Sequence, residues 1–86
     1  MQELQKYREE IDKLDSEIIS LLASRFEIVQ KVWEFKKKNN MPALQNWRWQ
    51  EVVDSRKKQA LEKWISQDFI EKIWNEIHDY ALYLEK

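Results

Sequence analysis

Residues 4–35 read LQKYREEIDKLDSEIISLLASRFEIVQKVWEF, and their pattern indicates the architecture of the whole chain. The apolar residues of this stretch recur at alternating steps of three and four positions, which is the spacing of a helix that packs along a partner for most of its length. The residues of this stripe are Leu4, Tyr7, Ile11, Leu14, Ile18, Leu21, Ile28, Val32 and Phe35. The pattern predicts one continuous helix from about Gln2 to Lys38.

Such a helix is too long for a compact monomer of 86 residues. At 1.5 Å per residue it would extend roughly 55 Å, whereas a folded chain of about 100 residues has a radius of gyration of only about 13 Å. We therefore expect the helix to extend beyond its own subunit and to pair with a second copy of the chain.

Two shorter helices are expected after it. Asn39 and Asn40 tolerate a left-handed C-cap and Pro42 cannot continue a helix, so the first helix should end before them. A second helix is predicted over roughly residues 46–62, and Ser66 is a predicted N-cap for a third that runs to the C-terminus. The core-facing residues expected in the second helix are Trp49, Val52 and Val53. We predict an all-α fold, a single domain over residues 1–86, assembled as an intertwined helical homodimer.

The composition excludes several classes of protein. The chain has no glycine, so a Rossmann-type phosphate loop is not expected, and it has no cysteine for disulfides or thiolate metal sites. The net charge of −1 argues against nucleic acid as a partner. His78 is the one histidine and cannot form a His-rich metal cluster. Without a signal peptide or an apolar run long enough to span a membrane, we expect a cytoplasmic protein with no membrane partner.

Cations occupy unexpected positions in this pattern. Arg25 interrupts the apolar stripe, and a buried guanidinium is costly unless it is paired, although a polar residue can also set the register of a coiled coil. Lys36 follows eleven positions later, so it shares a helix face with Arg25 at roughly 16 Å along the axis. Arg8 points elsewhere on the same helix but could reach the site of a partner chain. Arg48 begins the second helix between two tryptophans.

Each of these residues, taken alone, reads as an ordinary surface or register residue. Four cations that could converge in a helical interface instead indicate a small polyanionic ligand, bound by bidentate arginine–carboxylate contacts. Glu85 and Ala81, four residues apart near the C-terminus, share one helix face. Spacing and charge do not name the ligand.

The order of these motifs resembles the all-helical, type II, chorismate mutase family. The likeness lies in REEIDKLD at 8–15, IISLLASR at 18–25, VWEFK at 32–36, MPALQ at 41–45 followed by Arg48 and Trp49, and the last helix at 69–85. Together they cover almost the whole chain. The LQ-x-x-R-aromatic version is most similar to domains fused to the first enzyme of the shikimate pathway, DAHP synthase.

The resemblance implies a function and a set of site residues. Family members isomerise chorismate to prephenate by a pericyclic rearrangement that needs no cofactor and forms no covalent intermediate. Arg25 and the Arg8 of a partner chain would bind carboxylates, Lys36 would contact a carboxylate and the ether oxygen, and Glu85 would face that oxygen. The further substrate-binding residues implied are Arg48, which completes the cationic wall, Gln45 and Trp49 near the ring hydroxyl, and Ala81 at the carboxylate end.

Four positions depart from the family pattern. Ala81 stands where many relatives have serine, Trp49 where well-known members have glutamate, and a large indole at Trp33 where a small residue is common. Glu85 replaces a frequent glutamine, and only a protonated glutamic acid can donate a hydrogen bond to an ether oxygen. We therefore expect turnover to be favoured at acidic pH.

Two other interpretations stay open at this level. The same fold in related proteins carries isochorismate pyruvate lyase or aminodeoxychorismate mutase activity, and those relatives also lack the glutamate at the position of Trp49. The chain could also be a non-catalytic helical dimer or regulatory domain, in which Ala81 and Glu85 mark a decayed site.

Overall fold

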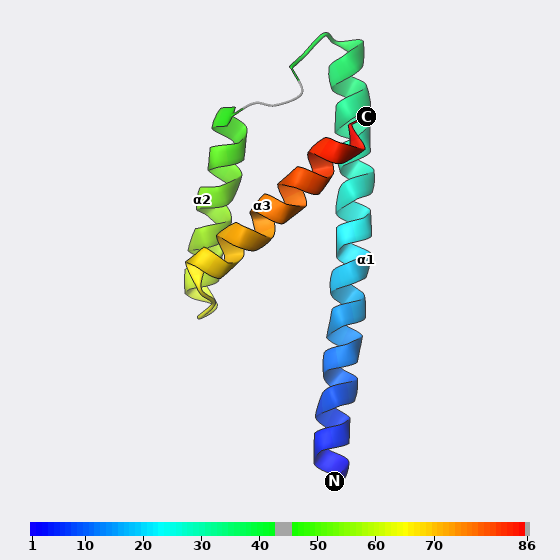
Figure 1. The fold of residues 1–86 in the computed structure, drawn as a ribbon, viewed down its shortest axis with the longest axis vertical. Coiled ribbons are helices and arrows are strands. Elements are labelled where there is room, and N and C mark those ends of the chain that lie inside the picture. Colours follow the sequence, from blue (N-terminus) through cyan, green and yellow to red (C-terminus); the bar gives the residue numbers. More distant parts are fainter. Residues whose placement is uncertain (43–45, 86) are drawn as a thin grey trace.

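The computed structural model describes residues 1–42 and 46–85, and in them the chain forms three helices and no strand. The helices are α1 (Gln2–Lys38), α2 (Asn46–Glu62) and α3 (Gln67–Leu84). α2 and α3 form a hairpin that lies beside the C-terminal half of α1, while the N-terminal half of α1 extends away from it (Figure 1). The prediction of an all-helical chain with one long and two shorter helices is therefore confirmed.

The small core lies between α2 and α3. Its buried residues are Val52, Val53, Ala60, Ile77 and Ala81. Val52 and Val53 face this core as their spacing predicts, but Trp49 does not, because its half-buried side chain lies against α3 at the edge of a cleft. An ion pair between Lys57 Nζ and Glu71 Oε1, 3.1 Å apart, also joins the two helices.

Side-chain contacts in the C-terminal half of α1 connect this helix to the hairpin of α2 and α3. The rings of Phe26 and Tyr80 meet edge to face with their centroids 4.8 Å apart. At the next residue of α3, the carbonyl oxygen of Ala81 accepts a hydrogen bond of 3.0 Å from Nε1 of Trp33. Even so, no residue of α1 is buried in the single chain. These contacts fix α3 against α1 at the place where the candidate site lies.

The helix ends follow the capping chemistry of their residues. Asn40 has a φ of 54°, and the amide of Met41 donates to the carbonyl of Lys36 at 2.9 Å, which is a Schellman motif. α2 ends in the same way, although the left-handed residue is Trp64, with a φ of 62°. The Oγ of Ser66 accepts a hydrogen bond of 3.2 Å from the amide of Phe69, so Ser66 is the N-cap of α3, as predicted.

The chain is markedly elongated. Its extents are 58 × 24 × 16 Å and its radius of gyration is 16.5 Å, whereas a compact chain of this length would have a radius of gyration of about 12 Å. None of the helices in the described ranges is long and apolar enough to cross a membrane. The elongation comes from α1, whose N-terminal half extends past the hairpin (Figure 1).

Candidate active site

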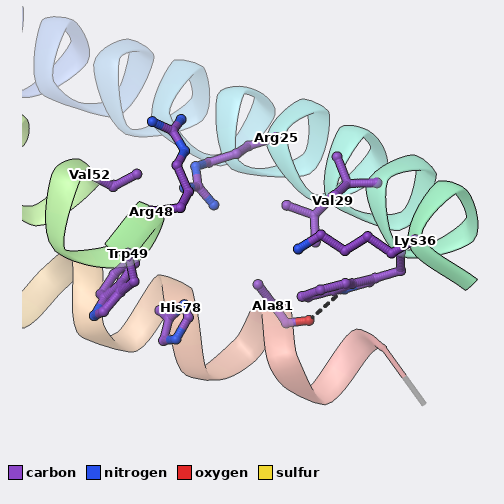
Figure 2. Close-up of a pocket in the computed structure, with 10 residues that line it drawn as sticks. Arg25, Val29, Lys36, Arg48, Trp49, Val52, His78 and Ala81 are labelled. Carbon is purple, nitrogen blue, oxygen red and sulfur yellow. Dashed lines mark hydrogen bonds between the residues drawn. The ribbon is translucent and has the colours of Figure 1, made fainter. Parts of the chain in front are cut away.

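A cleft of about 170 Å³ lies where the three helices meet (Figure 2). Its lining residues are Arg25, Val29, Val32, Trp33 and Lys36 from α1, Arg48, Trp49 and Val52 from α2, and His78 and Ala81 from α3. Five of the eight residues that the sequence singled out therefore lie around one cleft. None of the described lining residues is acidic.

Three cations face this cleft from two helices. Arg25 and Lys36 lie on the same face of α1, as their spacing of eleven residues predicts, and Arg48 approaches from the first turn of α2 (Figure 2). Burial lowers the pKa of Arg25, and the neighbouring charges of Arg56 and Arg48 lower it further. Arg48 also forms an ion pair of 3.0 Å with Glu51 on its own helix. Three cations around one cleft favour an anion that can contact several of them.

The far wall of the cleft is formed by Trp33. The amine of Lys36 lies over the indole ring, 5.0 Å from its centroid, in a cation–π arrangement. The same indole donates the hydrogen bond to Ala81 that is dashed in Figure 2. Trp33 therefore connects the side chain of Lys36 with α3. The sequence marked this position only as a large indole where a small residue is common.

His78 faces the cleft from α3 and stacks on Trp49. The two ring centroids are 3.9 Å apart and the rings are inclined by 16° (Figure 2). Burial lowers the pKa of His78, Asp79 opposes this effect, and the charge of Arg25 adds to it. His78 is not among the site residues predicted from the sequence, where a lone histidine was weighed only as a metal ligand. Its position three residues before Ala81, on the same helix face, was the available signal.

Two expected site residues lie away from this cleft. Glu85 lines a separate hollow of about 210 Å³ on α1 and α3, which Trp33 also lines, together with Gln30, Glu34, Lys37 and Leu84. Arg8 is exposed on α1, roughly 25 Å along the helix axis from Arg25. Gln45 lies outside the described residues.

Residues 7–86 match the family model of chorismate mutase type II. The chain belongs to that family. The match takes in α1 from Tyr7 onward, α2 and α3, so the predicted membership of the type II chorismate mutase family is confirmed.

The curated relatives are longer proteins that contain a similar segment. A bifunctional chorismate mutase/prephenate dehydratase from Aquifex aeolicus is 33% identical over 89 residues, which cover 100% of this chain and 25% of the relative. A T-protein from Haemophilus influenzae is 36% identical over 73 residues, or 85% of this chain and 19% of the relative. A T-protein from Enterobacter agglomerans is 34% identical over 71 residues, or 83% of this chain and 19% of the relative.

The chain thus spans only about a fifth to a quarter of the length of these relatives. None of the three is named as a fusion to DAHP synthase, so they do not support that finer part of the resemblance. No solved structure matches the chain significantly.

Proposed function

We propose that this chain is a chorismate mutase that isomerises chorismate to prephenate in the cytoplasm. The observation that carries the proposal is the convergence of Arg25, Lys36 and Arg48 on one cleft in a chain of the chorismate mutase type II family. Chorismate carries two carboxylates, and arginine binds carboxylates through paired hydrogen bonds. The remaining cleft wall is largely aliphatic and aromatic, which suits the carbon ring.

The reaction is an internal rearrangement. The ether C–O bond breaks while a C–C bond forms between the enolpyruvyl group and the ring, so no atom is gained or lost and no group has to be transferred to the protein. Negative charge increases on the ether oxygen as that bond breaks. Fixed cations next to the oxygen stabilise this charge, and the cleft holds the flexible substrate in its reactive conformation. We assign the carboxylates to Arg25 and to Arg8 of a partner chain. Lys36 contacts a carboxylate and the ether oxygen, and Arg48 completes the cationic wall.

We further propose that the active form is an intertwined homodimer in which Arg8 acts in trans. The apolar stripe of α1 is open to solvent in the single chain, with Leu14 57%, Ile18 55% and Leu21 69% exposed. Arg8 lies too far from Arg25 to reach the cleft of its own chain, since an arginine side chain spans far less than their separation of roughly 25 Å. The cleft, at about 170 Å³, is also smaller than the usual range of about 300–1,000 Å³, which fits a site that a second chain completes.

We retain the proposed role of Glu85 at the ether oxygen, provided that the side chain of Trp33 can move. Because Trp33 lies between the cleft and the hollow that Glu85 lines, the indole has to move before this carboxyl can face an ether oxygen beside Lys36. Gln45 and Trp49 are assigned to the ring-hydroxyl end and Ala81 to the carboxylate end, as the family resemblance implies. The likeness to domains fused to DAHP synthase, and a single domain over residues 1–86, are likewise kept as proposals.

The first experiment measures loss of chorismate absorbance with the purified chain and identifies the product. We expect prephenate to form, and Arg25→Ala to lower kcat/KM by roughly 10–150-fold, because a hydrogen bond to a charged group contributes about 1.5–3 kcal/mol. Lys31→Ala is the matched control, since Lys31 is an exposed cation of α1 that does not line the cleft. Turnover of isochorismate or aminodeoxychorismate in place of chorismate would reassign the substrate. Absence of turnover with all three would indicate a non-catalytic helical dimer.

A further inference from the structure

The side chains around the cleft are unbalanced in their hydrogen-bonding capacity. Of the ten described lining residues, three are cations and two are tryptophans, which only donate, and four are aliphatic. His78 is the remaining one. Within this set its imidazole is therefore the one side chain that can accept a hydrogen bond, and it can do so only when it is neutral.

The geometry of His78 leaves that acceptor available. Stacking on Trp49 at 3.9 Å occupies a face of the imidazole, whereas hydrogen bonds to the ring nitrogens lie in the ring plane and leave from its edge. The hydrogen bonds found within the described part of the chain do not involve these nitrogens. The stack also fixes the orientation of the ring, so its edge is held in the cleft wall instead of rotating freely.

The charge of the cleft favours the neutral form of His78. Arg25 faces it from α1, Arg48 lines the same cleft from α2, and Asp79 is its neighbour on α3. Burial and the charge of Arg25 together outweigh Asp79, so the pKa of His78 is below its ordinary value. At neutral pH the cleft thus contains cations for carboxylates and one neutral acceptor beside Trp49.

We propose that His78 is a specificity-determining residue that accepts a hydrogen bond from the ring hydroxyl of the substrate. This inference rests on the proposed function, because it takes chorismate as the ligand. The carboxylates of chorismate match the cations, while its ring hydroxyl is a donor that none of the other nine lining side chains can satisfy. His78 thereby supplies, from α3, the acceptor that a tryptophan at position 49 cannot provide.

The test compares two substrates on matched variants. The substrates are chorismate and deoxychorismate, which is chorismate without its ring hydroxyl. His78→Phe keeps an aromatic ring to stack on Trp49 but removes the acceptor, whereas His78→Gln keeps an acceptor on a side chain of different shape. We expect His78→Phe to lower kcat/KM for chorismate by about tenfold, the usual size for an unsatisfied donor, and to lower it far less for deoxychorismate.

The wild-type chain should prefer chorismate to deoxychorismate by a similar factor, and His78→Gln should recover part of that preference. Turnover of deoxychorismate by His78→Phe shows that this variant is folded. Equal losses for the two substrates, or no loss with either, would overturn the role of His78 while leaving chorismate mutase activity in place. If the wild-type chain turns over neither substrate, the proposed function itself fails, and the assignment of His78 fails with it.

Discussion

His78 and Glu85 lead to opposite expectations for the effect of pH. A neutral His78 can accept a hydrogen bond and a charged one cannot, so its contribution is lost in acid. Glu85 can donate a hydrogen bond only when it is protonated, so its contribution would be lost on ionisation. The sequence suggested the second behaviour, whereas the structure places His78 at the cleft and Glu85 in a separate hollow.

We expect kcat/KM for chorismate to fall as the pH is lowered below about 6.5, the ordinary pKa of histidine. The pKa of His78 lies below that value because of burial and Arg25, with Asp79 opposing, so the loss begins on the acidic side of it. The pH dependence of kcat/KM reports groups of the free enzyme, which makes it the appropriate measurement. His78→Phe should remove this acidic limb and Glu85→Gln should retain it.

The opposite pH dependence, with kcat/KM rising toward acid, would point to Glu85 instead of His78. A profile that rises toward acid and becomes flat in Glu85→Gln would show that Glu85 reaches the substrate, which requires the indole of Trp33 to move. It would also leave His78 without a part in the pH dependence. The two variants thus show whether His78 or Glu85 causes the pH dependence of kcat/KM.

The candidate site could be predicted only where helix geometry alone determines it. Arg25 and Lys36 share a face because eleven residues make almost three turns, whatever their side chains do. The placement of Trp33 depends instead on the rotamer of a large ring at the contact between α1 and α3, which residue spacing does not fix. For that reason the separation of Glu85 from Lys36, and the stack of His78 on Trp49, appear only in the structure.

At the scale of the helices, the turn from α2 to α3 contains a residue in an unfavourable conformation. Trp64 has a φ of 62° and is 97% exposed, so its backbone is left-handed and its indole makes almost no contact within the chain. A left-handed conformation costs a residue with a β-carbon roughly 1–2 kcal/mol, and glycine avoids this cost. The turn persists because the Schellman hydrogen bond from Ile65 to Ala60, at 2.9 Å, closes α2.

We expect Trp64→Gly to raise the free energy of unfolding by about 1 kcal/mol, after allowance for the larger entropy of glycine in the unfolded chain. Chemical denaturation followed by circular dichroism measures this change. Asn40→Gly is the matched control, since Asn40 has a similar φ of 54° but asparagine tolerates it, and its effect should be smaller. A loss of stability in Trp64→Gly would instead indicate that the exposed indole is covered in the assembled protein.

The helices themselves were largely determined by local sequence. The first two predicted ranges, 2–38 and 46–62, coincide with α1 and α2, and the cap at Ser66 begins α3. Local signals suffice here because caps and breakers act on neighbouring residues. Packing is a different matter, as Trp49 shows, since an apolar residue at helical spacing can line a cleft as well as a core.

For the whole molecule, the position of Arg8 leads to a testable prediction, namely that each active site of the homodimer combines residues of two chains. If the site combines Arg25 of one chain with Arg8 of another, Arg8→Ala and Arg25→Ala should each retain only a small part of wild-type activity. Refolded together, they should form hybrid dimers with one intact site, and an equal mixture should regain roughly a quarter of wild-type activity, as random pairing in a two-fold dimer requires. Turnover of chorismate before and after mixing measures this.

A second mixture provides the control. Arg25 and Lys36 belong to the cleft of one chain, so Arg25→Ala mixed with Lys36→Ala leaves every site with a defect and should regain nothing. Recovery in neither mixture, together with a monomeric sedimentation mass, would rule out an Arg8 contribution from a partner chain.

The absence of any buried residue in α1 has a consequence for how the protein responds to its own abundance. A helix with no buried residue in its own chain draws most of its stability from whatever covers its apolar stripe, and in the proposed homodimer that is another α1. Folding is then coupled to association by mass action, so the melting temperature should rise with protein concentration. Dilution would dissociate such a dimer and so lower its stability. A cell that makes little of the protein would therefore contain a larger fraction of unfolded chains.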